Sequence, residues 1–593
     1  MKGVLTMTLR IGLRIGSLAG AALLLATAAA AEPAPVWVDQ GRGWSGGARW
    51  DYYSRDQGSR IIPWKWIGAL KQADGRPFLA DSLTRYGYLP NERSPTPGLP
   101  VGFLVAKDKY GENLAVNCAA CHTRQIEVDG KAYRIDGGPA IADLGAFWAD
   151  LDAAANRLRT DPAAFAEFAR AVNGPSTTPE KDAALKEAFE TWFAQFDAIT
   201  QEGLLKAKPW GLGRMDAVGM IFNRVTGLDI GPPPSFILRA NMKPADAPVR
   251  PPFLWNAPIQ DRTQWPGFAE NGNSILALSR NLGQVFGVFG VFHPNKDDTH
   301  PLGFDYVSDN SGNFQGLLAL ERLVERIGPP RWPWPVDAKL AQEGEKIYSW
   351  RKDEGGCVEC HGKWVNPNGT WATPVTPLAE IGTDVREIVN LGRVVSTGAL
   401  TGASIPFLMD PLKATDAAAN VLGVAVRGSI LQYYFPGIRV DPKLRTGLVD
   451  LFAKVDGALP LLRPLVQQQV KKTLSDLRGA YPQPATALKP APGYEARVLE
   501  GVWAAAPYLH NGSVPSLAEL LKPAKDRVAS FAVGPAYDPV NVGLAATQTK
   551  FNRIQPTTGC EDVKSGDSRC GHEFGTRLTP DQKKALLEYL KTL

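Results

Sequence analysis

Two five-residue patterns, at residues 118–122 and 357–361, contain the residue types of this chain that are best suited to chemistry. Each reads Cys-x-x-Cys-His, the attachment motif of c-type haem. On one turn of helix, residues i, i+3 and i+4 share a face. Two thiols can therefore form thioether bonds with the haem vinyl groups while the adjacent imidazole coordinates the iron. We predict two covalently bound c-type haems, held by Cys118 and Cys121 with His122, and by Cys357 and Cys360 with His361.

A zinc site or a redox-active thiol pair is the alternative interpretation of a Cys-x-x-Cys motif. Structural zinc sites need four nitrogen or sulfur ligands, which are usually supplied by paired motifs. Neither motif of this chain has an obvious second half nearby. We therefore interpret both motifs as haem attachment sites.

The first 31 residues have the composition of a secretory signal peptide. Lys2, Arg10 and Arg14 make the start basic, and an apolar stretch over residues 18–31 ends in alanines directly before Glu32. A basic start, a short apolar middle and small residues at the cleavage point are typical of such signals. An uncleaved anchor is the alternative, although the stretch is short for a bilayer span. We predict a periplasmic or secreted protein with no membrane span after cleavage, and c-type haem is attached outside the bacterial cytoplasm.

The charge balance disfavours nucleic acid as a partner. The chain has a formal net charge of +5, and removal of the three basic signal residues lowers it to about +2. Such a small charge provides no electrostatic footprint for a phosphate backbone. A mature length of roughly 560 residues suggests two to four domains or one two-lobed body.

The distribution of proline and glycine shapes the fold prediction. The chain contains 48 prolines and 59 glycines, more than average usage, which indicates long ordered loops. Apolar residues recur at helical spacing over residues 141–171, 180–206 and 441–478. Residues 328–335 contain four prolines and cannot be helical, so we expect them to link two lobes. The predicted fold class is mainly α, with two cytochrome-c-like haem lobes and long ordered loops.

The expected domain order is a signal peptide at residues 1–31, an N-terminal c-type haem domain with insertions at residues 32–330, and a C-terminal cytochrome c domain at residues 331–593. The last domain should open with a helix over residues 337–348. Its final helix should start at Thr579, because a proline and a glutamine follow in the arrangement of a capping box.

Two cysteines, Cys560 and Cys570, remain outside the haem motifs. In an oxidising compartment, an even remainder suggests a disulfide. In the chain-entropy model, a cross-link over so short a loop would raise the free energy of unfolding by about 3 kcal/mol at best. A pair of free thiols is the alternative.

The sixth ligand of each iron decides what a c-type haem can do. A haem with two strong axial ligands transfers electrons, whereas one with an open position binds O₂ or peroxide. His572 is the best candidate at the second haem, because it follows Cys570 directly and a disulfide would hold its loop rigid. An exposed loop position for His572, or Met409 as the ligand, are the alternatives. His510 could ligate the iron or donate a hydrogen bond to a haem propionate.

The first haem has fewer candidate ligands. Besides His122, the first half of the chain offers only His293 and His300, both next to prolines in expected loops. We therefore predict that the first haem lacks a second imidazole and is the open, reactive one, with His122 as its proximal ligand. Closure by Met215 or Met220 is the alternative.

Tryptophan is abundant, with 16 residues. Most should pack around the macrocycles, because large aromatic rings fill such space well. A tryptophan between the haems could relay electrons, and Trp210 is the candidate for that role.

Further stretches carry a family resemblance. The clearest is the run Gly-Val-Trp-Ala-Ala-Ala-Pro-Tyr-Leu-His-Asn-Gly-Ser-Val-Pro-Ser-Leu, and the others lie at residues 135–140, 252–256, 264–265 and 280–290. Together they resemble the bacterial dihaem cytochrome c peroxidase superfamily, and more closely its rubber-oxygenase-like branch. The run quoted above, at residues 501–517, is specific to the superfamily, and the other stretches favour the branch.

The resemblance implies one haem at a substrate-binding centre and one low-spin haem. In rubber oxygenases the first haem binds O₂ and the enzyme cleaves isoprene double bonds to carbonyl fragments. Their second haem has two histidines, which supports His361 with His572. Peroxidases of the family carry a distal Gln or Glu in a Phe-Trp-Asp-Gly-Arg type segment. That segment is not found in this sequence, which disfavours a classical peroxidase. A distal aromatic residue is expected among residues 213–226.

The predicted function is therefore that of an enzyme, an exported dihaem c-type cytochrome oxidoreductase. It would activate O₂ or H₂O₂ at the N-terminal haem and use the C-terminal haem in electron transfer. A polyisoprenoid or other hydrophobic substrate and a redox partner protein are the expected partners. The alternatives are a dihaem cytochrome c peroxidase, a non-catalytic electron carrier and an enzyme that oxidises another protein.

Overall fold

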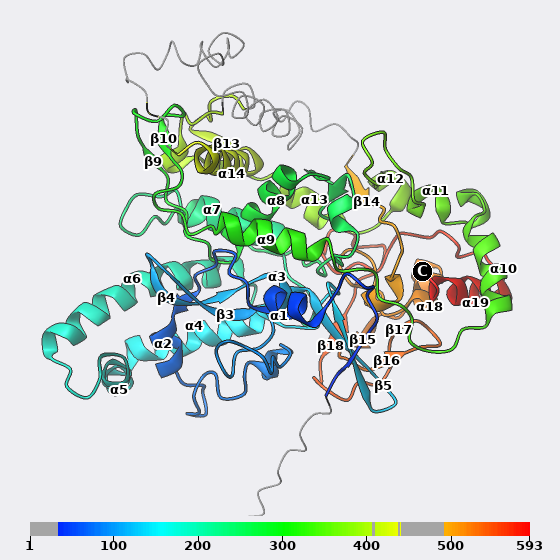
Figure 1. Cartoon of the computed structure of the whole chain (residues 1–593), viewed down its shortest axis with the longest axis horizontal. Coiled ribbons are helices and arrows are strands. Elements are labelled where there is room, and N and C mark those ends of the chain that lie inside the picture. The colour runs from blue at the N-terminus through cyan, green and yellow to red at the C-terminus, as the bar shows by residue number, and fades with distance from the viewer. Residues whose placement is uncertain (1–33, 406–408, 437–438, 440–491) are drawn as a thin grey trace, which may run out of the picture. The chain divides into compact units, whose positions relative to one another are not determined.

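The computed structural model describes residues 34–405, 409–436, 439 and 492–593. The described residues from Pro35 onward form one compact unit (Figure 1). The predicted signal peptide and the helix expected over residues 441–478 lie outside the described residues. No described helix combines the length and the apolar character that a bilayer span requires.

The fold mixes helices with many short strands, so the prediction of a mainly α protein with two cytochrome-c-like lobes is wrong. Helices account for about 37% and strands for about 15% of the structure. Within the described residues the strands form eight small sheets of two or three strands each. The strand content was missed because most of these strands are only two or three residues long, too short for an alternating pattern to stand out.

Two β-hairpins position the first Cys-x-x-Cys-His motif. Strand β3 (Phe103–Asp108) pairs antiparallel with β4 (Gly111–Val116), and β5 (Thr123–Val128) pairs antiparallel with β6 (Lys131–Asp136). The single helical turn α3 (Cys118–Cys121) connects β4 to β5. The first motif therefore lies between two strands and not at the end of a long helix.

Local sequence explains this arrangement. Asp129 and Gly130 join β5 to β6 with φ values of 49° and 72°. These left-handed conformations are the ones that an Asp-Gly hairpin turn uses. Asn117 caps the helical turn, because its side chain accepts a hydrogen bond of 2.9 Å from the N–H of Ala119. The hairpin signal of Asp129-Gly130 was available in the sequence and would have revealed these strands.

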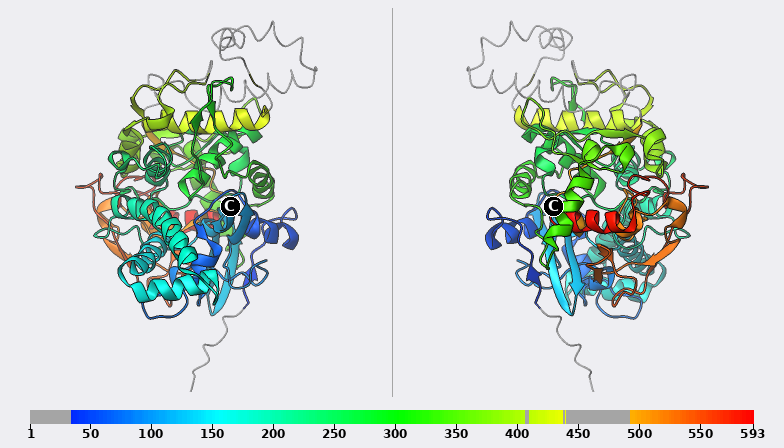
Figure 2. Two further views of the ribbon diagram at one scale, coloured as in Figure 1. Left: turned by 90° about the vertical axis from the view of Figure 1, so that its left-hand side faces the viewer. Right: turned by 90° about the vertical axis from the view of Figure 1, so that its right-hand side faces the viewer.

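Three helices pack with the first hairpin around an aromatic-rich core (Figure 2, left). The helices expected over residues 141–171 and 180–206 are confirmed as α4 (Leu144–Thr160), α5 (Pro162–Asn173) and α6 (Pro179–Gly203). Asp161 separates α4 from α5, because its side chain caps α5 and a proline follows at the first helical position.

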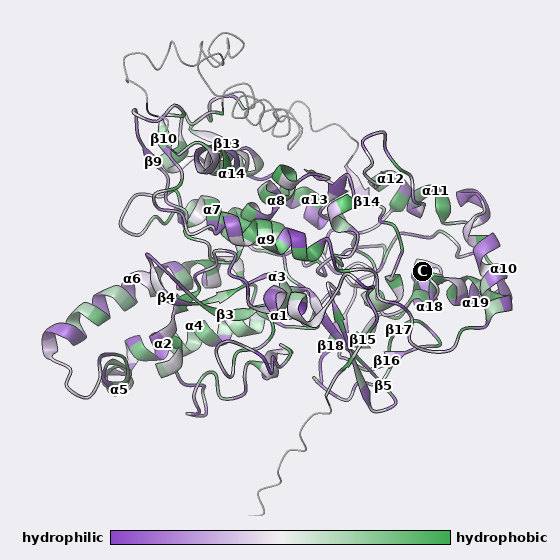
Figure 3. Cartoon of the chain, viewed as in Figure 1, coloured by the Kyte–Doolittle hydropathy of each residue, from purple (hydrophilic) through white to green (hydrophobic). Residues whose placement is uncertain are grey.

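A second core is built from helices that come from both halves of the chain. It joins α7 (Ala217–Gly227), α8 (Ser274–Gly287) and α9 (Phe314–Val324) with α14 (Ala418–Tyr434). The apolar faces of α8 and α9 are visible in Figure 3. Since α14 follows the second motif yet packs on α7 and α8, elements from both predicted domains share one core. The domain boundary near residue 330 stays a prediction.

The second motif lies in α11 (Val358–His361), shortly after α10 (Ala338–Tyr348). Helix α10 packs closely on the final helix α19 (Pro580–Leu590), as Figure 2 (right) shows. A Cβ atom at Gly344 would lie 2.0 Å from the carbonyl oxygen of Ala585, so only glycine permits this crossing. The helix expected over residues 337–348 and the capping box at Thr579 are both confirmed.

The remaining elements are short. The other helices are α1 (Gly46–Ser54), α2 (Trp64–Ala69), α12 (Leu378–Ile381), α13 (Arg386–Leu391) and α18 (Leu517–Leu520). The other strands are β1 (Val36–Trp37), β2 (Ile62–Pro63), β7 (Arg262–Thr263), β8 (Ala269–Glu270), β9 (Asn295–Lys296), β10 (Phe304–Asp305), β11 (Val375–Pro377), β12 (Val394–Ser396), β13 (Thr415–Ala417), β14 (Gly493–Glu495), β15 (Ser530–Ala532), β16 (Tyr537–Asp538), β17 (Gly543–Leu544) and β18 (Ile554–Pro556).

Candidate functional site

Each Cys-x-x-Cys-His motif opens onto its own cavity. The first cavity is lined by Cys118, Cys121 and His122, and the second by Cys357, Cys360 and His361. Their empty volumes, mouths included, are about 1400 Å³ and about 1290 Å³. Each cavity thus borders the two thiols and the imidazole that would hold a haem.

In the second cavity two imidazoles face each other. The ring centroids of His361 and His572 are 6.2 Å apart. Metal–imidazole bonds are about 2 Å long, so a metal ion between two such rings puts their centroids about 6 Å apart. The observed separation fits a haem iron held by His361 and His572.

The protonation of both rings suits this role. The Nδ1 of His361 donates a hydrogen bond of 2.6 Å to the carbonyl oxygen of Arg497, which leaves Nε2 with its lone pair for a metal. Burial lowers the pKa of His361 below its ordinary value. Burial and the neighbouring His361 lower the pKa of His572 to about 3. Both imidazoles are therefore neutral near pH 7, as metal ligands must be.

The backbone around His572 is fixed from several sides. Its N–H donates to the carbonyl oxygen of Ile381 at 2.7 Å. Both Gly571 and His572 have positive φ, at 82° and 50°. The Arg527 guanidinium donates to the carbonyl oxygens of Gly571 and His572, at 2.8 Å and 3.2 Å. Such strained and multiply bonded backbone holds a ligand in one orientation.

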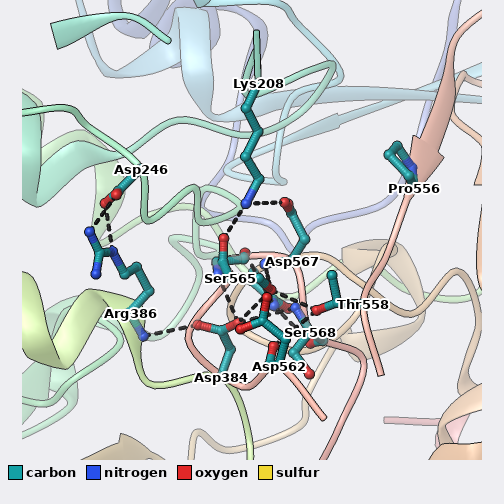
Figure 4. A network of polar contacts seen from close by, with 12 residues as sticks. Lys208, Asp246, Asp384, Arg386, Pro556, Thr558, Asp562, Ser565, Asp567 and Ser568 are labelled. Carbon is teal, nitrogen blue, oxygen red and sulfur yellow. Dashed lines mark hydrogen bonds and ion pairs between the residues drawn. The ribbon is translucent and has the colours of Figure 1, made fainter. Parts of the chain in front are cut away.

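The loop that precedes His572 is anchored by a polar network, which Figure 4 shows. The carboxylate of Asp384 accepts hydrogen bonds from the N–H groups of Gly566 and Ser568, at 2.9 Å and 3.1 Å. Lys208 forms an ion pair of 2.8 Å with Asp567. These contacts tie the loop to the segments that follow α12 and α6.

The predicted disulfide between Cys560 and Cys570 is confirmed, and it closes this loop. Replacing both cysteines with serine should lower the free energy of unfolding by about 3 kcal/mol, because a cross-link over so short a loop removes about that much chain entropy from the unfolded state. Chemical denaturation under non-reducing conditions measures this loss. Wild-type protein in reducing buffer is the control, and equal stability of the oxidised wild type and the variant would contradict the prediction.

The structure also places the alternative ligands. His510 lines the second cavity, where its ring stacks on Tyr494 with centroids 3.9 Å apart. Burial lowers the pKa of His510 to about 3. Met409 packs against the second core, where a Cβ atom added to Gly423 would lie 3.0 Å from the Sδ of Met409. Of these two, only His510 is among the described residues that line the second cavity.

The first cavity differs in its ligands. Of the described residues that line it, only His122 is a histidine, and burial lowers its pKa to about 4. Met215 and Met220 also line this cavity, so the thioether alternative is compatible with the geometry. The two histidines expected in loops, His293 and His300, are not among the described residues that line this cavity. His293 stacks on Phe236, and the side chains of His300 and Gln432 form a hydrogen bond of 2.6 Å.

The two aromatic residues expected to serve the haems are the one within residues 213–226 and Trp210. The aromatic residue within residues 213–226 is Phe222, which is buried in the second core. Trp210 is buried against Trp148, and its indole N–H donates to the carbonyl oxygen of Ala245 at 2.7 Å. Neither Phe222 nor Trp210 is among the described residues that line a cavity. The relay role of Trp210 stays a prediction.

Three residues line both cavities and therefore lie between them: Arg250, Trp265 and Arg497. The Arg250 guanidinium lies over the Trp265 ring, 4.6 Å from its centroid. Arg497 donates to the carbonyl oxygen of Phe253 at 2.8 Å. Trp265 belongs to a stretch that carries the family resemblance, whereas neither arginine has a sequence signal, because their positions between the cavities depend on distant parts of the chain.

The surroundings of Arg250 are suited to the binding of an anion. Arg250 is buried, its Nη1 finds no hydrogen-bond partner, and burial lowers its pKa to about 9. A buried guanidinium without a counter-ion is costly, and a carboxylate is its natural partner. Haem carries two propionates, so an anionic haem at this place would satisfy the guanidinium.

If each cavity holds a haem, replacing Arg250 with leucine should lower the reduction potentials of both by some tens of mV, since a positive charge nearby stabilises the reduced iron. A spectroscopic redox titration measures this shift. Arg224→Leu is the matched control, because Arg224 is also buried and is not among the described residues that line either cavity. Unchanged potentials in Arg250→Leu, or an equal shift in the control, would contradict the placement of Arg250 beside the haems.

Comparisons with known proteins agree with a haem protein. A family model described as RoxA-like, cytochrome c-like matches residues 493–532. The chain therefore carries a RoxA-like cytochrome c segment. That segment contains Tyr494 and His510 of the second cavity, and it relates the chain to the rubber-oxygenase-like branch.

Two relatives come from Sinorhizobium fredii (strain NBRC 101917 / NGR234). Uncharacterized protein y4iJ is 29% identical over 623 residues, which span 94% of this chain and 93% of the relative. Uncharacterized protein y4iM is 38% identical over 364 residues, which span 58% of this chain and 63% of the relative. The first of these similarities extends over nearly the whole chain and therefore well beyond the RoxA-like segment.

Proposed function

We propose that this protein is an exported dihaem c-type cytochrome oxidoreductase that activates O₂ at its first cavity and uses its second cavity for electron transfer. One observation carries the proposal. In the described residues, two imidazoles face each other across the second cavity, whereas His122 is the single histidine of the first. An iron with an open position binds O₂ or peroxide, and an iron held by two imidazoles transfers electrons.

The residues of this chain have distinct roles in the proposal. The four motif cysteines attach the haems, and the histidine of each motif is the proximal ligand. His572 completes the second site and excludes small ligands from it. Arg250 binds a propionate, and Trp265 lies between the two cavities, where an aromatic ring shortens the path of an electron.

The substrate class follows from the RoxA-like segment together with the resemblance described above. We propose a polyisoprenoid or a similar hydrophobic chain, cleaved at its double bonds to carbonyl products. The apolar side chains of Met220 and Ile221 from α7 line the first cavity and suit such a substrate. Export to the periplasm or medium, and a redox partner that loads electrons, are part of the same proposal.

Electron paramagnetic resonance of the oxidised protein tests the asymmetry directly. We expect one high-spin and one low-spin haem, and we expect the reduced protein to bind one CO. Oxygen consumption with polyisoprene latex under air, compared with turnover on added peroxide, separates oxygenase from peroxidase. Two low-spin haems without CO binding would favour a pure electron carrier, and Met215→Ala or Met220→Ala would then reveal whether a thioether closes the first site.

A further inference from the structure

The wall of the first cavity contains a buried carboxyl group. Glu387 lies in α13, lines the first cavity and is only 3% exposed. Its Oε2 is buried and forms no hydrogen bond. A buried carboxyl oxygen without a hydrogen-bond partner destabilises a fold, and an apolar side chain at the same place would not. Groups of this kind cluster at functional sites.

The neighbouring charges are distributed so that Glu387 holds a proton. Two other acids, Asp216 and Asp384, act on it electrostatically. Asp216 accepts hydrogen bonds from the N–H groups of Gly219 and Ala247, at 2.7 Å and 3.0 Å. Asp384 accepts from backbone N–H groups as described above. Because amide donors stabilise a carboxylate and Glu387 has none, the neutral member of this trio is Glu387.

The basic groups nearby are engaged elsewhere. The guanidinium of Arg386, the next residue in the chain, pairs with Asp246 at 2.8 Å. Arg393 donates to the side-chain oxygen of Asn223 at 2.6 Å. Burial, followed by the charges of the two acids, raises the pKa of Glu387 well above its ordinary value, and no basic group offsets this. Tyr494, which interacts electrostatically with Glu387, also has a raised pKa and is neutral.

We propose that Glu387 is the proton donor of the first cavity. It would donate to an oxygen atom of the O₂ or peroxide bound there, so the inference rests on the proposed function. The O–H bond of the carboxyl breaks, and an O–H bond forms on the oxygen of the bound molecule. The carboxylate that remains takes up a proton from a hydronium ion of the solvent, which becomes water, and no electron moves in this step. The residue thus supplies the acid that the missing peroxidase segment would otherwise provide.

The test compares Glu387→Gln with Glu387→Asp and Asp229→Asn. Asp229 is a matched control, because it is buried, its Oδ2 lacks a partner, and it is not among the described residues that line either cavity. Infrared difference spectra are recorded on photolysis of CO from the reduced holoprotein, together with the rate of O₂ or peroxide consumption as a function of pH.

For the wild type we expect a carbonyl band of a protonated carboxyl that shifts in D₂O. The band should vanish in Glu387→Gln and persist in Glu387→Asp and Asp229→Asn. The rate should fall about 100-fold or more in Glu387→Gln, as for the loss of a general acid, while haem content and spin states stay unchanged. The wild-type rate should also decline at high pH, because the donor is active only when protonated, and Glu387→Gln should lack this decline.

Two failures can be told apart. If the wild type binds no CO, the proposed function fails. If CO binds normally but the band is absent or unaffected by Glu387→Gln, or if the rate of that variant equals that of the wild type, the role of Glu387 alone is refuted.

Discussion

Replacing Cys118 and Cys121 with serine should yield a protein that carries one haem fewer and consumes no O₂ above background. The two thiols line the first cavity, and burial raises their pKa values to about 11 and about 12, so they are neutral thiols before attachment. Without thioether bonds the first cavity holds no covalent haem, so the protein should show one covalent haem fewer under denaturing conditions. Intact-protein mass spectrometry and haem-stained gels measure the loss.

The matched variant replaces Cys357 and Cys360 with serine. It should also lose one haem, but it should keep CO binding at the first cavity and lose the low-spin signal. Together the two variants assign each spectral signal to one motif. If the Cys118/Cys121 variant kept O₂ consumption and the Cys357/Cys360 variant lost CO binding, the two cavities would have the opposite roles to those proposed.

Replacing His572 with alanine should convert the second haem from low-spin to high-spin and raise CO binding from one to two molecules per protein. The physical reason is that no other described histidine faces His361 at a distance suited to a shared metal. His572→Met should keep a six-coordinate iron and raise its reduction potential by on the order of 100 mV, because a thioether is a weaker donor and axial ligands span about 0.8 V.

His510→Ala is the control for this prediction. His510 borders the same cavity and is buried, yet its ring stacks on Tyr494, whereas the ring of His572 faces that of His361. We expect its loss to leave the low-spin signal intact. If His510→Ala abolished that signal and His572→Ala did not, the ligand of the second haem would be His510.

Local sequence predicted the features that depend on a few neighbouring residues. The helices after Asp161 and Thr579 begin where their capping residues and prolines indicate. The disulfide followed from counting cysteines, and it lies next to His572 as expected. The strands on either side of Cys118–Cys121 were not predicted, because a haem motif suggests a helical lobe, and the local signal for strands is limited to the hairpin turn at Asp129-Gly130.

The sequence by itself determined which atoms can hold haem, since thioether attachment depends on the spacing of residues within one helical turn. It also limited the candidates for the sixth ligand, because histidines are few. Only the tertiary structure decided that His572 faces His361, that Arg250 and Trp265 lie between the cavities, and that Glu387 borders the first one. These residues come from segments more than 90 positions from the motif that they serve, and chain folding alone brings them to the same cavity.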